Sequence, residues 1–315
     1  MAFEIPKQPY SGAIKPVTIG KGDKAITLGG ETSYPFYLFE GVMPNKPRIA
    51  LEVWDKNPGE DWAAPVLEVY KDVLNDPVAW AQKCVNDFGA EAIALILAST
   101  DPNGDDASPE SAAQTAKKVA EAIDVPLIVY GTSAMEKDAE VLAAVAEACQ
   151  GHNVILGPVQ DKNYKKIGAA ALGYQHTVVA NTPIDVNLAK QLNILLGNLG
   201  VPDSRILVDP TTGGLGYGME YSYSVMERDR MAALTQEDEK LQLPIVNYIG
   251  QEVWKVKECK LGNEEAPELG DQITRGILME AVTAVSLLLA GSDLLIMRHP
   301  EAAKLAKGLI EELTG

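Results

Sequence analysis

A short apolar run, ending in polar or glycine residues and followed by an amphipathic helix, occurs eight times along this chain of 315 residues. The apolar runs are residues 49–53, 93–98, 127–130, 154–156, 177–179, 206–208, 245–248 and 294–297. The helices are expected near residues 76–88, 109–123, 136–149, 162–172, 185–199, 219–241, 271–290 and 300–313. Continuously apolar strands that alternate with helices indicate a parallel sheet covered on both faces. Eight such units predict an α/β fold, the closed (β/α)8 TIM barrel.

An open, doubly wound sheet is the alternative architecture for alternating strands and helices. Such a sheet usually carries a glycine-rich turn after its first strand. Here the corresponding residues 55–58 are Asp-Lys-Asn-Pro, and no G-x-G-x-x-G motif follows. No linker divides the chain further, so residues 48–315 are expected to form one barrel domain.

Residues 1–47 differ from the rest because they are rich in proline, glycine and aromatic residues. Val17–Ile19 and Ala25–Leu28 flank Gly-Lys-Gly-Asp, which predicts a short β-hairpin. We expect an N-terminal arm whose hairpin closes the bottom of the barrel. The aromatic cluster at residues 34–39 either contacts a partner or packs against the chain's own barrel, and the second interpretation is favoured.

The charge balance excludes two classes of partner. With 27 basic and 44 acidic residues the net charge is −17, which argues against nucleic acid and against an anionic membrane surface. The first residues show no signal-peptide pattern. The longest apolar stretch, residues 276–291, is too short to span a bilayer and contains Glu280. We therefore expect a cytoplasmic protein in which this stretch is a core helix.

The cysteines do not form a metal or cluster motif. Cys84, Cys149 and Cys259 are widely spaced and include no C-x-x-C, whereas an iron–sulfur cluster usually needs four thiolate ligands. Cys84 and Cys149 lie on apolar helical stripes, which predicts core positions. Cys259 lies in a charged stretch, which favours exposure. No iron–sulfur cluster is expected in this chain.

The three histidines do not form a metal cluster either. His152 and His176 precede strands, at the end of a barrel that usually serves stability, and are expected to be structural. His299 follows the last strand, where it can face the functional end or cap the last helix. No metal site is predicted.

Polar residues follow nearly every predicted strand, at the end of the barrel where TIM-barrel function is located. Helix capping explains part of this pattern, since Ser, Thr, Asp and Asn also begin helices. The set contains many neutral hydrogen-bonding groups and no catalytic pair, so no catalytic residue is assigned. Its members are Asp55, Ser99, Thr100, Asp101, Thr132, Ser133, Gln160, Asn181, Thr182, Asp209, Thr211, Thr212, Asn247, Gln251, Arg298 and His299.

The most distinctive of these segments follows the sixth strand, where residues 209–218 are Asp-Pro-Thr-Thr-Gly-Gly-Leu-Gly-Tyr-Gly. Glycines allow the backbone to approach a ligand closely, and the two threonine hydroxyls can donate or accept hydrogen bonds. The helix that follows favours a negative group such as phosphate. A merely flexible loop is the alternative interpretation.

Two segments carry a resemblance to a known family. Residues 44–55 (PNKPRIALEVWD) and 209–224 (DPTTGGLGYGMEYSYS) resemble the small subunit of the corrinoid iron–sulfur protein, the delta-type subunit of the acetyl-CoA synthase/decarbonylase system. The resemblance covers the whole chain. It implies a heterodimer with a large subunit that holds a four-iron cluster and a corrinoid. It further implies a methyl group carried from methyltetrahydrofolate methyltransferase to acetyl-CoA synthase in the reductive acetyl-CoA pathway.

The resemblance also implies a non-catalytic role for this chain, with the corrinoid (cobalamin) at the interface with the large subunit. The corrin is a wide, mostly apolar disc edged with amides, so its contacts are expected from close backbone approach and neutral polar groups. The residues assigned to it are Thr132, Ser133, Asn181, Thr211, Thr212, Gly213, Gly214, Leu215 and Gly216.

Two other functions stay open from the residues themselves. A pterin-dependent corrinoid methyltransferase barrel is the first, with Asp55, Asp101, Asn181 and Asp209 as the pterin-binding set. A barrel that metabolises sugars or phosphates is the second. That function would require a lysine or paired carboxylates at the strand ends, and the sequence offers neither clearly.

Overall fold

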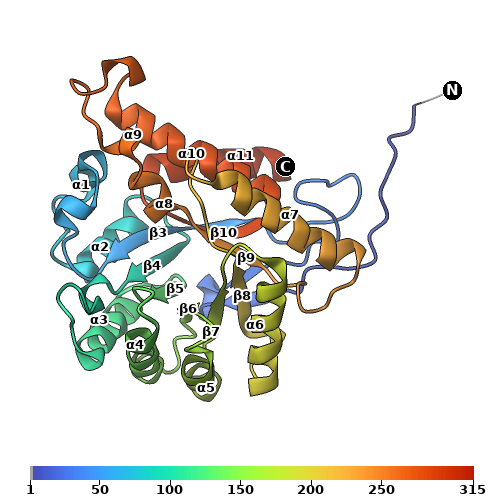
Figure 1. Ribbon diagram of the computed structural model, residues 1–315, viewed down its shortest axis with the longest axis horizontal. Helices are drawn as coiled ribbons and strands as arrows, with labels where there is room; N and C mark the ends of the chain where they lie inside the picture. The colour runs from blue at the N-terminus through green and yellow to red at the C-terminus, as the bar shows by residue number, and fades with distance from the viewer. Residues whose placement is uncertain (1–2) are drawn as a thin grey trace.

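Eight parallel strands close into a barrel in the computed structural model, which describes residues 3–315. The strands follow one another around the barrel in chain order, and β10 closes it against β3 (Figure 1). They are β3 (Arg48–Trp54), β4 (Ala92–Ile96), β5 (Leu127–Tyr130), β6 (Ile155–Val159), β7 (Thr177–Asn181), β8 (Ile206–Asp209), β9 (Ile245–Tyr248) and β10 (Ser292–Met297). The predicted TIM barrel is confirmed.

The predicted helices surround the barrel (Figure 1). They are α2 (Pro77–Asn86), α3 (Pro109–Ala122), α4 (Met135–Ala148), α5 (Tyr164–Tyr174), α6 (Val186–Leu199), α7 (Met219–Thr235), α10 (Gln272–Ala290) and α11 (Pro300–Thr314). Three short helices were not predicted, namely α1 (Ala64–Tyr70), α8 (Ile249–Trp254) and α9 (Lys257–Lys260). They lie in connections that follow strands β3 and β9, too short to show a helical period.

Several predicted boundaries differ from the observed ones, and two of them differ for identifiable local reasons. Helix α7 ends at Thr235 rather than at residue 241, because Glu237 has a φ of 55° and cannot continue a right-handed helix. Strand β4 ends at Ile96, and Ala98–Thr100 form a 3-10 turn instead of extending the strand. The other 3-10 turns are Gly22–Lys24, Gly59–Asp61, Asp203–Arg205 and Pro267–Leu269.

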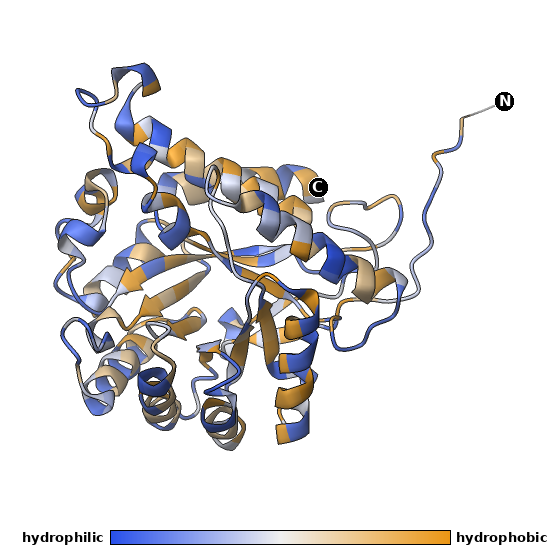
Figure 2. Ribbon diagram, in the orientation of Figure 1, coloured by the Kyte–Doolittle hydropathy of each residue, from blue (hydrophilic) through white to orange (hydrophobic). Residues whose placement is uncertain are grey.

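Strand side chains divide between two apolar layers. Alternate residues such as Ala50, Ile128 and Leu207 point inward and fill the barrel, while Leu51, Val129 and Val208 point outward against the helices. The strands are therefore mostly apolar on both faces, as their predominantly orange colour in Figure 2 shows. This explains why the strands appear in the sequence as continuous apolar runs.

The N-terminal hairpin closes the bottom of the barrel. Strands β1 (Val17–Ile19) and β2 (Ile26–Leu28) pair antiparallel, with Val17 opposite Leu28. Val17, Ile19 and Leu28 are at most 1% exposed and belong to the same apolar cluster as the inward residues of the barrel strands. The hairpin thus seals the N-terminal ends of the strands and leaves the C-terminal ends open.

Among residues 3–315, helix α10 alone is long and apolar enough to cross a membrane, judged by length and composition. Its inner face buries Glu280, Ala284 and Leu287 against neighbouring elements, which include β10 and α7. α10 is therefore a helix of the barrel wall, as expected, but its outer face is exposed at Leu278 and Val282.

All three cysteines are buried. The prediction for Cys84 and Cys149 is confirmed, but the expected exposure of Cys259 is wrong. Helix α9 turns Cys259 inward, where its Sγ lies 3.6 Å from the sulfur of Met279 on α10. Burial raises the pKa of the Cys259 thiol to about 12, so the thiol is held neutral.

Candidate functional site at the C-terminal mouth of the barrel

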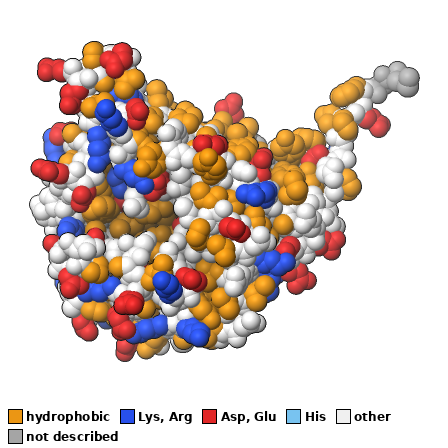
Figure 3. Space-filling view, in the orientation of Figure 1, with side chains coloured by type: hydrophobic (Ala, Val, Ile, Leu, Met, Phe, Trp, Pro, Cys, Tyr) orange, Lys and Arg blue, Asp and Glu red, His pale blue; other side chains and the backbone are white. Residues whose placement is uncertain are grey.

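The C-terminal ends of the strands surround a cavity of about 460 Å³. Figure 3 shows a hollow in the molecular surface over β3 and β4. Side chains from β3 round to the segment after β9 line the cavity, so residues far apart in the sequence meet in it. They are Trp54, Lys56, Asp61, Ile96, Ala98, Asp101, Gly104, Tyr130, Gly131, Thr132, Ser133, Pro158, Asn181, Asp209, Thr211, Thr212, Tyr248, Gln251 and Glu252.

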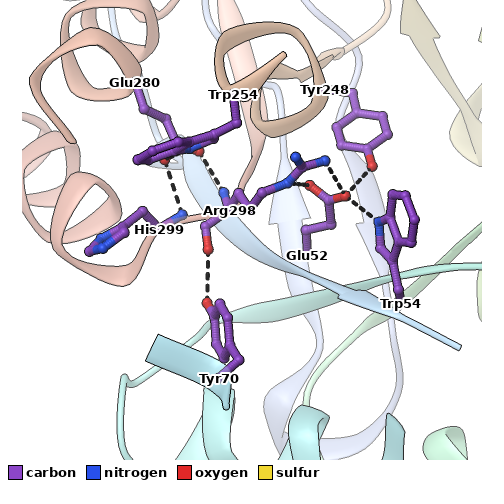
Figure 4. A network of polar contacts seen from close by, with 8 residues as sticks. All are labelled: Glu52, Trp54, Tyr70, Tyr248, Trp254, Glu280, Arg298 and His299. Carbon is purple, nitrogen blue, oxygen red and sulfur yellow. Dashed lines mark hydrogen bonds and ion pairs between the residues drawn. The ribbon is translucent and has the colours of Figure 1, made fainter. Parts of the chain in front are cut away.

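At the base of the mouth, two aromatic side chains donate hydrogen bonds to Glu52, whose charge is neutralised by Arg298. Glu52 on β3 accepts hydrogen bonds from Trp54 Nε1 at 2.6 Å and from the Tyr248 hydroxyl at 2.5 Å (Figure 4). Arg298 donates to the two Glu52 carboxylate oxygens at 2.9 and 2.8 Å. The Tyr130 and Tyr248 rings meet edge to face with centroids 5.7 Å apart. The base is thus rigid, aromatic and without unpaired charge.

A second buried carboxyl braces the end of β10. Glu280 on α10 accepts from the backbone N–H groups of Arg298 and His299 at 2.5 and 3.0 Å, and from Trp254 Nε1 at 2.8 Å (Figure 4). Burial raises the pKa of Glu280 to about 7. This brace fixes the backbone that carries Arg298, so it sets the position of the guanidinium under the mouth.

His299 is a helix cap and not a mouth residue. Its Nδ1 accepts the backbone N–H of Glu301 at 3.2 Å, and its ring stacks on Trp254. Burial lowers the pKa of His299 to about 4, so the ring is neutral near pH 7. Of the two roles that the sequence left open, the structure places His299 in the capping role. His176, as predicted, is buried and bonded to backbone.

Asp209 is the acidic group at the mouth with the most perturbed environment. It ends β8, is 5% exposed, and accepts the backbone N–H of Thr211 at 2.9 Å. Burial, opposed by that hydrogen bond, raises the pKa of Asp209 to about 7. Near neutral pH the carboxyl therefore exists partly as the acid, which can donate as well as accept a hydrogen bond.

Several buried polar atoms near the C-terminal ends of the strands have no hydrogen-bond partner among the described residues. They lie in or directly after strands β5, β6, β7 and β9, and two of the residues, Tyr130 and Thr132, line the cavity. Buried polar groups without partners are uncommon in native proteins, and a group of them at one mouth indicates a place where a ligand supplies the partners. The atoms are Tyr130 OH, Thr132 Oγ1, Gln160 Oε1, Thr182 Oγ1 and Asn247 Oδ1.

Five of the nine residues assigned to cofactor contact line this cavity, namely Thr132, Ser133, Asn181, Thr211 and Thr212. Ser133 is exposed and has a φ of 66°, which turns the chain at the rim. Asn181 accepts from Gln160 Nε2 at 2.8 Å. Thr212 accepts from Asn247 at 3.1 Å. These groups form a neutral polar rim.

The glycine-rich loop is held in place beside the mouth. Gly213 donates to Ser222 Oγ at 2.7 Å, and Leu215 donates to Thr283 Oγ1 at 3.1 Å. A Cβ on Gly214 would lie 3.1 Å from the backbone of Glu252 in α8, which shows how closely the loop packs there. Gly216 is exposed with a φ of 75°. Residues 213–216 do not line the cavity, so they border the mouth from outside.

Two of the charged groups at the rim are paired with neighbours. Lys56 contacts Asp105 at 2.6 Å, and Glu252 contacts Lys255 at 2.5 Å. Asp55 accepts from the backbone and hydroxyl of Ser99 rather than facing the cavity. Within residues 3–315 no group of three or more His, Cys, Asp or Glu residues is arranged to hold a metal ion. Asp61, Asp101 and Asp209 line the cavity as well, so the mouth combines neutral hydrogen-bonding groups with carboxyl groups.

Sequence reasoning missed the aromatic base. Trp54, Tyr130 and Tyr248 each occupy the last position of a strand, within three residues of a polar group that was singled out. An aromatic residue at the last position of a predicted strand could have indicated a side chain at the mouth, because the C-terminal end of each strand borders the mouth of a TIM barrel. No local sequence pattern predicted the Glu52–Arg298 ion pair, because its two residues are far apart in the chain.

Comparisons with known proteins agree with this architecture. The family model described as CO dehydrogenase/acetyl-CoA synthase delta subunit matches residues 16–315. The acetyl-CoA decarbonylase/synthase complex subunit delta of Archaeoglobus fulgidus is 38% identical over 325 residues, which cover 99% of this chain and 71% of that protein. The subunit from Methanothermobacter thermautotrophicus is 36% identical over 314 residues, covering 99% and 79%.

Solved structures of dihydropteroate synthases share the fold. The Xanthomonas albilineans enzyme superposes with a TM-score of 0.60 at 14% identity over 96% of this chain and 99% of that one. The Thermus thermophilus enzyme gives 0.55 at 16% identity over 89% and 98%. Because these sequence identities are low, the similarity establishes only that this chain shares the barrel fold. The family match extends over nearly the whole chain and confirms the resemblance found at residues 44–55 and 209–224, so this chain belongs to the CO dehydrogenase/acetyl-CoA synthase delta subunit family.

Proposed function

We propose that this chain is the non-catalytic small subunit of a corrinoid iron–sulfur methyl carrier, with its barrel mouth facing a corrinoid held by a larger subunit. The observation that carries the proposal is the set of neutral hydrogen-bonding groups at the rim, including Thr132, Asn181 and Thr212, above an aromatic base. The carrier receives its methyl group from a methyltetrahydrofolate methyltransferase and delivers it to acetyl-CoA synthase, in the cytoplasm. Family membership supports this assignment.

The mouth residues fit a corrinoid. The corrin edge carries neutral amides, and the rim offers Thr132, Asn181 and Thr212 to pair with them. Gly216 is exposed beside the mouth, where its backbone can approach the disc. Bound cobalt would supply the methyl-carrying chemistry. The residues of this chain cover the corrin face, hold it by neutral hydrogen bonds and exclude water.

The outer face of α10 is the surface that we assign to the larger subunit. Leu278, Val282 and Leu289 recur at helical spacing and are 49, 47 and 45% exposed. Leu305 on the adjoining α11 is 51% exposed. Contiguous exposed apolar side chains of this kind mark protein interfaces.

Co-expression of this chain with the corrinoid-holding subunit tests the proposal. Sedimentation should give a 1:1 heterodimer with a corrinoid absorption spectrum, and Thr132→Val/Asn181→Leu should change that spectrum or loosen the corrinoid. The isolated chain should not transfer a methyl group from methyltetrahydrofolate to added cob(I)alamin. Turnover by the isolated chain would instead support the pterin-dependent methyltransferase.

A further inference from the structure

The aromatic cluster at residues 34–39 has two sides. Tyr34 and Phe36 pack against the barrel core, which was the favoured prediction for the cluster. Tyr37 and Phe39 are 49 and 43% exposed, so the prediction is wrong for these two side chains. Pro35, at the start of this loop, borders a small void that three buried charged residues also line. The charges of these three residues do not balance.

Two of the three residues, Arg230 on α7 and Asp293 on β10, form an ion pair at the bottom of the barrel. Arg230 Nη2 donates to Asp293 Oδ2 at 2.5 Å, and both side chains are 4% exposed. The guanidinium also donates to the carbonyls of Gly291 and Leu243 at 2.5 and 3.2 Å. Asp293 Oδ2 accepts the backbone N–H of Ile245 at 2.6 Å as well. Asp293 is therefore the ionised partner, because it accepts from a cation and from a backbone N–H.

Strand pairing and a glycine fix the position of this ion pair. The register between β9 and β10 shifts between Ser292 and Leu294, so Asp293 lies at an irregular point of the strand. Such irregularities re-aim a side chain, and here the carboxylate reaches the first residue of β9. A Cβ on Gly291 would lie 2.6 Å from Arg230 Nε, so glycine leaves the room that the guanidinium occupies.

Glu31, which follows β2, brings a second carboxyl to this pair. It is 5% exposed, and no side chain of residues 3–315 donates a hydrogen bond to either of its carboxyl oxygens. It lines a void of about 10 Å³ together with Arg230 and Asp293, and this void is too small for more than one water molecule. The charged groups that act on Glu31 are Asp293 and Arg230.

One negative charge is left over if both carboxyls ionise. Both terminal nitrogens of Arg230 already donate to Asp293 or to backbone carbonyls. A buried carboxylate without its own cation is strongly unfavourable, whereas a carboxylic acid can donate its O–H to a facing carboxylate. Glu31 is therefore the group that binds a proton. Burial, together with the charge of Asp293, raises the pKa of Glu31 well above its ordinary value of 4.5.

Glu31 also belongs to the backbone pairing that extends the N-terminal hairpin. Ile14 N donates to the Glu31 carbonyl at 2.9 Å, and Gly30 N donates to the Ile14 carbonyl at 2.9 Å. Displacement of Glu31 from the barrel would therefore pull on both segments that flank β1 and β2. We propose that the Glu31–Asp293 carboxyl pair is a proton-dependent latch, which holds the hairpin over the bottom of the barrel and releases it when Glu31 loses its proton to water.

A proton suits this site better than a metal cation. The void has room for at most one water molecule, and the guanidinium of Arg230 on its wall repels a second cation. Asp229, the neighbour of Arg230 in α7, is a separate group, because the charges that act on it are Arg230, Arg228 and Asp185. The latch therefore depends on Glu31, Asp293 and Arg230.

Ionisation of Glu31 should weaken the latch over a defined pH range. The closed chain holds a proton that the opened chain, with Glu31 in water, loses above the ordinary pKa of 4.5. The contribution of the latch to closure is therefore complete below that value, and it is lost as the pH rises through the raised pKa of the closed chain. Between the two pKa values, each pH unit should multiply the equilibrium constant for opening by about ten.

The latch lies at the end of the barrel away from the mouth. Glu31 meets Asp293 close to the first residue of β10, whereas the mouth is formed where the strands end. Opening of the hairpin would expose Val17, Ile19 and Leu28, which now fill the bottom of the barrel. This inference therefore stands independently of the proposed function, which concerns the opposite end.

Hydrogen–deuterium exchange of the full-length chain tests the latch. Exchange of residues 13–32, corrected for the intrinsic effect of pH, should quicken at least about tenfold in the wild type between about pH 5 and 8. Glu31→Gln keeps the shape of the side chain and a donor for Asp293 but cannot ionise, so its exchange should lack this dependence. Glu147→Gln is the matched control, since Glu147 is exposed on α4, and it should behave as the wild type.

Three results would refute the latch. The first is the same pH dependence of hairpin exchange in the wild type and in Glu31→Gln. The second is equal acceleration in β5 of the same wild-type sample, which would indicate global opening and can be read even if the variant does not fold. The third is hairpin exchange that responds to sodium concentration instead of pH, which would place a metal cation where we place the proton.

Discussion

Glu52 and Arg298 lie 246 residues apart in the chain and form a two-point ion pair across the seam where the first and last barrel strands meet. Their side chains are 0 and 3% exposed. Arg298 also lies over the Trp62 ring, with 4.2 Å from the guanidinium carbon to the ring centroid. This pair closes the barrel beneath the mouth and supports Trp54 and Tyr248, which form its aromatic base.

Replacement of Arg298 by methionine should destabilise the chain strongly. The variant leaves the Glu52 carboxylate buried without its cation, and removal of one partner from a buried pair typically costs about 3–5 kcal/mol. Urea denaturation of wild type and variant measures the difference. Glu52→Gln/Arg298→Met is the matched control, since it removes both charges and should recover most of the lost stability. If the single and double variants were equally unstable, the loss would come from packing and not from the unpaired charge.

Asp209→Asn should change how stability depends on pH. The folded-state pKa is about 7 and the ordinary value is 3.8, so the folded chain binds more protons than the unfolded chain between these values. The contribution of Asp209 to the free energy of unfolding is therefore greatest below pH 3.8, and it is lost as the pH rises through about 7. Asparagine keeps the acceptor for Thr211 N but does not ionise.

The difference in free energy of unfolding between wild type and Asp209→Asn reports the titration of Asp209 alone, because the other buried acids are the same in both proteins. The variant should be more stable than the wild type by about 1–3 kcal/mol at pH 8, and the gap should close toward pH 4. Denaturant titrations across this range measure it. A difference that does not vary with pH would contradict a raised pKa at Asp209.

The glycine-rich loop should respond differently at two of its glycines. Gly214→Val should displace the loop from α8 and destabilise the chain by about 1–3 kcal/mol, because even a Cβ there approaches the Glu252 backbone to 3.1 Å. Gly216→Asn should be tolerated, since Gly216 meets nothing within 4 Å and asparagine accepts a positive φ. Thermal melts measure stability, and methyl transfer by the heterodimer measures function. Equal loss of stability in the two variants would contradict the conclusion that Gly214 is closely packed and Gly216 is not.

The chain expressed alone should contain no stoichiometric metal. Its cysteines are dispersed and their burial raises each thiol pKa to about 12, which disfavours the thiolate that metals bind. Elemental analysis for iron, zinc and cobalt after gel filtration checks this. One tightly bound metal ion per chain would contradict the expectation, and the same assay on the heterodimer serves as the positive control.

The sequence predicted the barrel well because its signals are local. Strands buried on both faces are apolar at most positions, and helices present one apolar stripe, so the type of each of the eight units can be recognised within about ten residues. Thr132, Asn181 and Thr211 were found for the same reason, since each directly follows or ends an apolar run. Cys259 was misjudged because its exposure depends on α9, a helix of four residues that has no detectable period.

The sequence by itself therefore determined the fold class, the open end of the barrel and the polar residues around it. Tertiary structure alone decided which side chains meet there: that Glu52 pairs with Arg298, that Tyr130 meets Tyr248, and that Gly214 packs on α8 outside the cavity. It also decided which aromatic residues of the 34–39 loop face outward. The physical reason is that hydrophobic periodicity is written along neighbouring residues, whereas barrel closure joins residues that no local pattern relates.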